Sequence, residues 1–155
     1  MATGSRIADI RADAANRPAR GRVHRPLVPA CVLVADDDPL TLDLIEFKLA
    51  SCGYGVVTAA DGELALACAL NYRPNLIVLD ARMPVLDGFE VLKRLRRDRR
   101  TATTPVIILT ARRQDRDVFA AMAVGAQDYL AKPFLPEELV RRVGRLLASS
   151  GRSFA

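Results

Sequence analysis

The sequence predicts an α/β protein in which a doubly wound, five-stranded parallel sheet forms a single domain. Five apolar runs of strand length alternate with five segments of helical period between residues 31 and 148, which is the order expected of βα units. Several of these runs are apolar throughout, as is typical of strands that helices bury on both faces. Right-handed crossovers between such strands make the doubly wound sheet the favoured topology.

The first strand and the first helix have clear signals. Residues 31–35 form an uninterrupted apolar run, which indicates a buried strand. Asp38 can cap the following helix, Pro39 suits its first turn, and Gly53 ends it. We expect the inward, apolar face of this helix to consist of Leu40, Leu44, Phe47 and Leu49.

The remaining elements follow from the same signals. Helices are expected where apolar residues recur at helical spacing, and strands where short apolar runs stand between turn residues. The predicted elements are a strand at 54–59, a helix at 61–71, a strand at 76–79, a helix at 87–97, a strand at 105–109, a helix at 115–124, a strand at 129–131 and a helix at 136–148.

Length and composition exclude several classes of protein. A chain of 155 residues, 50% hydrophobic and 26% charged, suits one globular domain that folds without disulfides or a structural metal. No apolar run approaches the roughly 18 residues that span a bilayer, and no secretory signal is expected. The three cysteines, Cys31, Cys52 and Cys68, form no CxxC pair. We therefore expect a cytoplasmic protein whose reduced thiols fill apolar space.

The net charge of +5 is concentrated near the amino terminus. Residues 1–29 hold six arginines and two aspartates, a net of +4, whereas the rest of the chain has 17 basic and 16 acidic side chains. We expect residues 1–29 to be a basic, disordered extension, residues 30–150 the folded domain, and residues 151–155 a short tail. The alternative for the extension is a basic arm that touches an acidic partner.

Polar side chains follow four of the predicted strands. Because the carboxyl ends of parallel strands meet at one edge of a sheet, where open α/β sheets bind ligands, we expect a single cleft there. Each residue alone could be a helix cap, a turn residue or a solvated cation, but their joint occurrence argues for a site. The set comprises Asp36, Asp37 and Asp38 after the first strand, Asp80 after the third, Thr110 after the fourth and Lys132 after the fifth.

Crowded carboxylates at this edge favour a magnesium site. Like charges repel one another, and Mg²⁺ relieves the repulsion with oxygen ligands from one or two carboxylates. Asp37 and Asp80 are the candidate ligands, with Asp36 touching the ion or standing just behind it. Asp80 can also act as a nucleophile that forms an aspartyl phosphate. Lys132 would neutralise phosphoryl charge together with Mg²⁺, and Thr110 would donate a hydrogen bond to a phosphoryl oxygen.

Four segments resemble the receiver domains of two-component response regulators. They are residues 32–39 (VLVADDDP), 79–88 (LDARMPVLDG), 108–111 (ILTA) and 128–134 (DYLAKPF). The resemblance extends over about residues 31–148 and implies a flavodoxin-like fold with five parallel strands in the order 2-1-3-4-5. It also implies a bacterial-type signalling protein that takes a phosphoryl group from a sensor histidine kinase or a phosphotransfer protein.

The resemblance implies a role for each matching residue of the acidic edge. Asp80 would be the phospho-accepting aspartate, and Asp36 and Asp37 the acidic pair that binds Mg²⁺. The backbone carbonyl of Arg82 would be the third protein ligand of the ion. Gly88 would allow close backbone approach in the loop after the third strand.

The resemblance also implies a switch. Thr110 would sense the phosphoryl group and Lys132 would contact it, while Tyr129 would be the aromatic residue that moves together with Thr110. Their shift would remodel the face built from the fourth helix, the fifth strand and the fifth helix, and a downstream protein would recognise that face. Candidate residues for a partner or homodimer contact on this face are Asp128, Glu138 and Arg142.

Three positions depart from the family pattern or vary within it. Arg82 and Arg112 lie just past Asp80 and Thr110, and we hypothesise that these long cations protect the phosphoryl group from water and prolong the phosphorylated state. Gln127 stands where many DNA-binding regulators have an acidic residue, which puts the homodimer in question.

A receiver that signals by binding proteins is the first interpretation. The alternatives are the receiver fragment of a DNA-binding or other effector regulator, and a phosphatase or phosphotransferase with an aspartyl nucleophile. Such enzymes usually carry a second acid two residues after the nucleophile, where this chain has Arg82. We therefore expect no enzyme activity beyond Mg²⁺-dependent self-phosphorylation and autodephosphorylation at Asp80. The basic run at 93–100 ends a helix, where cations complement the helix dipole, so neither nucleic acid nor membrane is expected as a partner.

Overall fold

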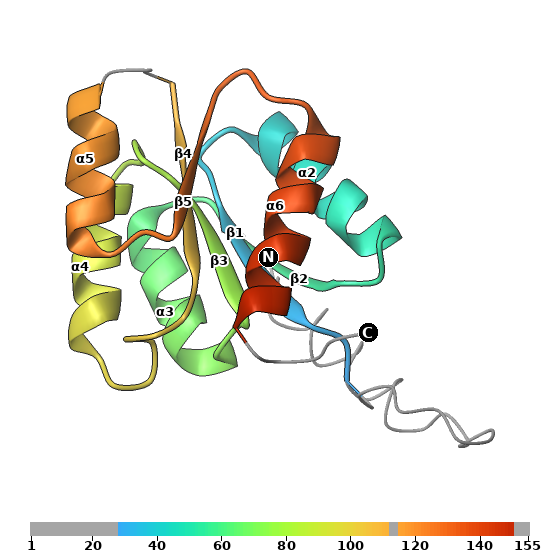
Figure 1. The fold of residues 1–155 in the computed structure, drawn as a ribbon, viewed down its shortest axis with the longest axis horizontal. Coiled ribbons are helices and arrows are strands. Elements are labelled where there is room, and N and C mark those ends of the chain that lie inside the picture. Colours follow the sequence, from blue (N-terminus) through green and yellow to red (C-terminus); the bar gives the residue numbers. More distant parts are fainter. Residues whose placement is uncertain (1–27, 112–114, 151–155) are drawn as a thin grey trace.

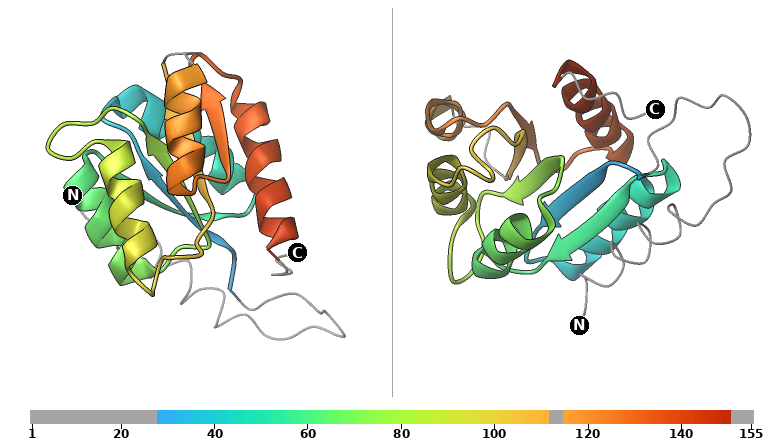
Figure 2. Two further views of the ribbon diagram at one scale, coloured as in Figure 1. Left: turned by 60° about the vertical axis from the view of Figure 1, so that its left-hand side comes forward. Right: turned by 90° about the horizontal axis from the view of Figure 1, so that it is seen from below.

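The computed structural model describes residues 28–111 and 115–150, which form one α/β unit with helices on both faces of a central sheet (Figures 1 and 2). The predicted extension up to residue 27 and the predicted tail at 151–155 lie outside the described residues. None of the described helices is long and apolar enough to cross a membrane.

The sheet has five parallel strands in the order β2-β1-β3-β4-β5, as the resemblance implied. The carboxyl ends of the strands are level, since Ala35 pairs with Leu79, Asp80 with Leu109, and Thr110 with Ala131. Side chains that follow the strands therefore meet at one edge. The strands are β1 (Cys31–Ala35), β2 (Gly55–Ala59), β3 (Leu76–Asp80), β4 (Val106–Thr110) and β5 (Asp128–Ala131).

Aspartates cap three of the helices, among them Asp38, the predicted cap of the first helix. Asp38, Asp61 and Asp87 each accept a hydrogen bond from a backbone N–H of the first turn, over 3.2, 2.8 and 2.9 Å respectively. These carboxylates also complement the positive end of each helix dipole. The helices are α2 (Pro39–Ser51), α3 (Gly62–Tyr72), α4 (Gly88–Arg97), α5 (Asp115–Val124) and α6 (Pro136–Ser149).

Two apolar layers bury the sheet. Helices α3, α4 and α5 cover one face, and α2 and α6 cover the other (Figure 1). Every residue of β1 to β4 is buried, which explains why these strands are apolar apart from Thr58 and the terminal residues Asp80 and Thr110. Cys31 and Cys68 lie in this core as predicted, but Cys52 is exposed, so the prediction that it fills apolar space was wrong.

The predicted inward face of α2 was wrong at three of its four residues. Leu40, Leu44 and Phe47 are 78%, 53% and 74% exposed, whereas Leu49 is buried as predicted. The other residues of the face that packs on the sheet are Leu42 and Ile45. Apolar residues occupy both sides of this helix, so helical spacing alone could not choose between the two stripes. The buried stripe is the one that packs with β1, β3 and α6 in the core on this face of the sheet.

Candidate functional site

Three carboxylates meet at the carboxyl edge of the sheet. Asp36 directly follows β1, Asp37 comes next, and Asp80 is the last residue of β3. One carboxylate oxygen from each lies within 4.8 Å of the others. Asp36 is fully buried and Asp80 is 7% exposed, whereas Asp37 is exposed. The site is therefore a buried acidic pair that opens to solvent on the side of Asp37.

Lys132 joins the two buried carboxylates. Its Nζ lies 2.7 Å from Oδ2 of Asp36 and 3.3 Å from Oδ2 of Asp80. The backbone N–H of Lys132 donates to the carbonyl of Thr110 over 2.8 Å, which fixes the lysine at the edge beside β4. The structure thus brings together the acids and the ammonium group that the sequence placed after separate strands.

Burial and neighbouring charges explain the shifted pKa values of Asp80 and Lys132. Burial raises the pKa of Asp80 to about 6, and the neighbouring Asp36 adds to the rise, while Lys132 and the backbone N–H of Arg82 oppose it. Burial alone would lower the pKa of Lys132, but its bonds to Asp36 and Asp80 outweigh burial and raise it. With its three carboxylates ionised and Lys132 protonated, the cluster carries a net charge of −2.

The donor set fits Mg²⁺. All three acidic side chains offer oxygen ligands, and a divalent cation would neutralise their net charge of −2. The exposed side of Asp37 leaves room for water ligands. Arg82 lies beside the cluster, since its backbone N–H donates to Oδ1 of Asp80 over 3.3 Å. The role of its carbonyl as a ligand stays a prediction. The third aspartate in the row, Asp38, is occupied as the cap of α2.

The loop that follows β3 is tightly turned. The N–H of Leu86 donates to the carbonyl of Pro84 over 2.8 Å, and Val85 between them has φ +72°. An i to i+2 bond around a positive φ is a strained γ-turn, and a β-branched residue is unfavourable there. The strain is held in the loop that carries Arg82, next to the acidic cluster.

Two glycines pack closely against the backbone of this loop and of the residue before it. A Cβ on Gly88 would collide with the backbone carbonyl of Asp80, which confirms the close approach predicted at this glycine. A Cβ on Gly62, in the first turn of α3, would collide with the backbone carbonyl of Leu86. Sequence reasoning missed Gly62. The signal was an Asp-Gly pair at a helix start, which is too common to identify a contact with another loop.

Thr110 and Tyr129 differ in their surroundings. Thr110 ends β4 beside the acidic edge and is 5% exposed, while Tyr129 lies on β5 and is 40% exposed. In the sheet register Tyr129 pairs with Ile108, two residues before Thr110. Thr110 thus ends the strand that pairs with β3, which carries Asp80. Its contact with a phosphoryl group and its coupled movement with Tyr129 stay predictions.

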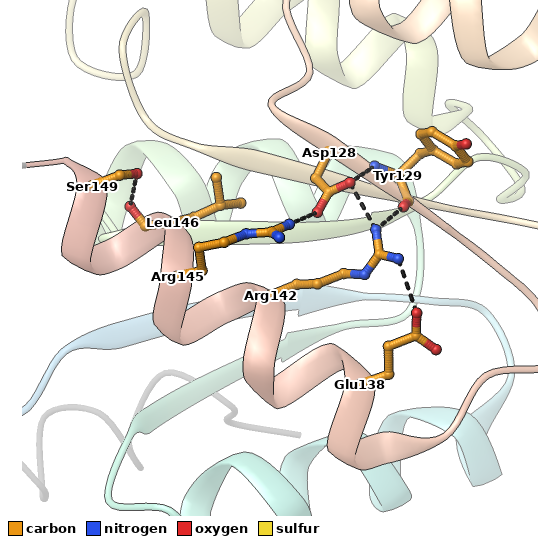
Figure 3. A network of polar contacts seen from close by, with 7 residues as sticks. All are labelled: Asp128, Tyr129, Glu138, Arg142, Arg145, Leu146 and Ser149. Atoms are coloured by element: carbon orange, nitrogen blue, oxygen red, sulfur yellow. Dashed lines mark hydrogen bonds and ion pairs between the residues drawn. The ribbon is translucent and has the colours of Figure 1, made fainter.

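The three residues predicted for a partner face bond to one another within the chain (Figure 3). Arg142 lies 2.8 Å from a carboxylate oxygen of Asp128 and 2.9 Å from one of Glu138, and it donates to the carbonyl of Tyr129 over 2.8 Å. Arg145 makes a second ion pair with Asp128 over 3.1 Å. This network fixes α6 against β5.

Gln127 has a local structural role. Its Oε1 accepts from the backbone N–H of Val106 over 2.7 Å and from Arg96 over 2.9 Å. Arg96 also donates to the carbonyls of Gly125 and Thr101, so the amide joins α4 to the beginnings of β4 and β5. Arg82 is exposed beside the cluster, whereas Arg112 lies outside the described residues.

Comparisons with known proteins place the chain in a family. The model of the response regulator receiver domain matches residues 32–144. The DNA-binding dual master transcriptional regulator RpaA of Synechocystis is 46% identical over 121 residues, which are 78% of this chain and 50% of that protein. The alkaline phosphatase synthesis regulator PhoP of Bacillus subtilis is 42% identical over 119 residues, 77% of this chain and 49% of PhoP. The chain thus spans about half the length of these relatives.

Solved structures agree. The chemotaxis protein CheY4 of Vibrio cholerae has a TM-score of 0.73 and 38% identity, covering 76% of this chain and 98% of CheY4. The receiver domain of the sensor histidine kinase PA1611 of Pseudomonas aeruginosa has a TM-score of 0.72 and 36% identity, covering 78% of this chain and 99% of that domain. That domain was solved with a magnesium ion coordinated in its active-site cleft. The chain therefore belongs to the receiver domains of response regulators and has the CheY-like receiver fold.

Proposed function

We propose that Asp80 accepts a phosphoryl group and that Asp36, Asp37 and the backbone carbonyl of Arg82 hold the Mg²⁺ that the transfer needs. The observation that carries this proposal is the cluster itself: three carboxylates within 4.8 Å of one another and one ammonium group 3.3 Å from Asp80. A partly buried cluster with a net charge of −2 destabilises the fold unless a cation neutralises it.

The contacts of Asp80 suit a nucleophile. The N–H of Arg82 donates to Oδ1 and Lys132 donates to Oδ2, so both carboxylate oxygens have fixed directions. In the transfer, an Asp80 oxygen forms a bond to phosphorus while the phosphorus–nitrogen bond of a phosphohistidine breaks, and the imidazole keeps the electron pair. Bound Mg²⁺ supplies positive charge to the phosphoryl oxygens. Lys132 adds a second positive charge, and Thr110 donates a hydrogen bond to the same group.

Phosphorylation would act on the face built from α5, β5 and α6. The hydroxyl of Thr110 is drawn toward the phosphoryl group, and Tyr129 follows by moving inward from its half-exposed position. The ion pairs of Asp128, Glu138 and Arg142 border this face, so their rearrangement would expose charges to a downstream protein or a second copy.

The phosphodonor is a sensor histidine kinase or a phosphotransfer protein. An exposed apolar stripe on α2, made of Leu40, Leu44 and Phe47, begins two residues after the acidic cap Asp38 and gives such a protein a docking surface at the rim of the site. The absence of a second acid at position 82 favours a receiver over a phosphatase. The names of the longer relatives favour transcriptional control as the output.

A beryllofluoride titration followed by NMR tests the proposal. With beryllium fluoride and Mg²⁺ together, amide signals of the acidic edge and of β5 and α6 should shift, and either component alone should not produce this pattern. Asp80→Asn should abolish the response. Asp43→Asn, which removes an exposed acid on α2, should preserve it. Shifts that persist in Asp80→Asn would contradict the assignment of Asp80.

A further inference from the structure

Exposed arginines gather at the edge of the sheet opposite the acidic cluster. We call the group of Arg73, Arg97, Arg99 and Arg100 the basic pole. Arg73 follows α3, Arg97 ends α4, and the other two lie in the loop before β4. Figure 1 shows the ends of α3 and α4 together at the amino edge of the strands.

Hydrogen bonds hold the loops of this edge side by side. Asn75 and Cys31 exchange two bonds of 2.8 Å, which places the α3–β3 loop beside the start of β1. The N–H of Ile77 donates to the carbonyl of Pro105 over 2.9 Å, which places the α4–β4 loop beside the start of β3. The cations therefore sit on an ordered surface.

The pole has more positive charge than its own acids can balance. Asp98 is the acid in the α4–β4 loop, and Arg100 already engages it with bonds of 3.0 and 2.7 Å. That bonding lowers the pKa of Asp98 to about 2, with Arg73 contributing through its charge. Among the described residues, Arg97 and Arg99 have no ion-pair partner, and neither does Lys93 one turn before Arg97.

Helix-end chemistry explains only part of the group. Cations in the last turn of α4 complement its dipole, as the sequence suggested for residues 93–100. Arg73 is the C-cap of α3, where a cation also complements the helix dipole, and it has a left-handed backbone with φ 44°. Arg99 lies in the α4–β4 loop, two residues after the end of α4. The loop offers these cations one acid, Asp98, which Arg100 already engages, so the edge can accept an external anion.

The surface chemistry identifies the kind of anion. Protein interfaces rely on buried aromatic or aliphatic anchors, and membrane binding also needs apolar insertion. Most exposed large apolar side chains of the described residues lie elsewhere, mainly on α2 and in the loops at the carboxyl edge, and none lies within 93–104. Val28, shortly before β1, is 36% exposed and offers this edge a single small apolar side chain. Arginine fits phosphate with two parallel hydrogen bonds, and duplex DNA carries one charge per about 1.7 Å of axis.

The charge distribution of the rest of the molecule also favours binding of a polyanion at the basic edge. The carboxyl edge carries Asp36, Asp37 and Asp80, so a polyanion is repelled there and attracted to the opposite edge. The chain enters β1 at the basic edge, where Gly55 bonds to the carbonyl of Ala30 over 2.9 Å.

We propose that the basic pole binds the phosphate backbone of duplex DNA without reading its bases. The phosphorylation edge stays open while DNA is bound, so the two activities can coexist on one domain. This inference does not depend on phosphorylation of Asp80.

Fluorescence anisotropy with a short labelled duplex of arbitrary sequence tests it on the full chain. Binding should weaken as salt rises, with a slope of log Kd against log salt of about 0.9 per phosphate contact. The triple variant Arg73→Gln, Arg97→Gln, Arg99→Gln should reduce that slope by up to about 3 and weaken binding at low salt at least about tenfold.

A matched variant removes the same charge elsewhere: Lys48→Gln, Arg141→Gln, Arg145→Gln on α2 and α6 should largely keep the slope. Both variants should still accept a phosphoryl group from acetyl phosphate, which separates this proposal from the assignment of Asp80.

No binding by the wild type at low salt would overturn the proposal. An unchanged slope in the first variant would overturn it too, because residues 1–29 would then carry the binding. Equal affinity for polyglutamate or for phosphatidylserine vesicles would assign the pole to a protein or a membrane instead.

Discussion

Replacing Asp80 by asparagine should make the metal-free domain more stable near pH 7. The folded-state pKa of Asp80 is about 6, against an ordinary value of 3.8 in the unfolded chain. Between pH 3.8 and about 6, Asp80 is therefore protonated in the folded state and ionised in the unfolded chain. Stability falls as pH rises through this window, because ionising the buried acid beside Asp36 is costly.

The magnitude follows from the same values. At about 1.4 kcal/mol per pKa unit, the rise from 3.8 to about 6 sets an upper limit of about 3 kcal/mol. Asparagine keeps an acceptor for Lys132 but weakens that bond, so we expect a gain of about 1 to 3 kcal/mol at pH 7.

Urea unfolding in the presence of EDTA, at pH 7 and at pH 4, measures this difference. Asp80→Asn should be more stable than the wild type at pH 7, and the two should converge at pH 4, where Asp80 is protonated. Adding Mg²⁺ at pH 7 should stabilise the wild type and leave Asp80→Asn nearly unchanged. A variant that is less stable at pH 7, or a gain that persists at pH 4, would refute the electrostatic reasoning.

Three further substitutions test neighbouring features. Lys132→Met leaves the fully buried Asp36 without its partner and should cost about 3 kcal/mol in urea unfolding without metal; an unaltered midpoint would contradict this. Gly62→Ala should displace the loop after β3 and lower Mg²⁺ affinity about tenfold, measured as the Mg²⁺-dependent rise in Tm. Gly144→Ala, whose Cβ would meet only a tyrosine hydroxyl at 3.7 Å, is its control and should keep the full rise. Val85→Asn should stabilise by about 1 kcal/mol, since asparagine tolerates φ +72° better and the side chain is 75% exposed; destabilisation would argue against strain in this turn.

The fold was predictable from the sequence because its two signals, apolar runs and helix caps, are local. Strands that are buried on two faces must be apolar along their whole length, as 31–35 and 76–79 are. Caps such as Asp61 mark helix starts through bonds to their own first turn. The clustering of Asp36 and Asp80 was also predictable, because parallel strands bring their carboxyl ends to one edge.

Features that depend on contacts between distant segments were not predictable. The inward face of α2 was wrong because the helix has two apolar stripes, and only tertiary packing shows that Ile45 rather than Leu44 is buried. The contact of Gly62 with the loop after β3 has no local signature. The exposure of Cys52 depends on where α2 ends relative to the sheet.

Intact-mass spectrometry after incubation with acetyl phosphate decides whether Asp80 is the Mg²⁺-dependent phosphoryl acceptor. The wild type should gain the mass of one phosphoryl group when Mg²⁺ is present and should gain nothing when EDTA replaces it. Asp80→Asn should gain nothing under either condition, while Asp43→Asn should behave as the wild type does. A phosphoryl group that appears without a divalent cation, or that Asp80→Asn still acquires, would contradict the account.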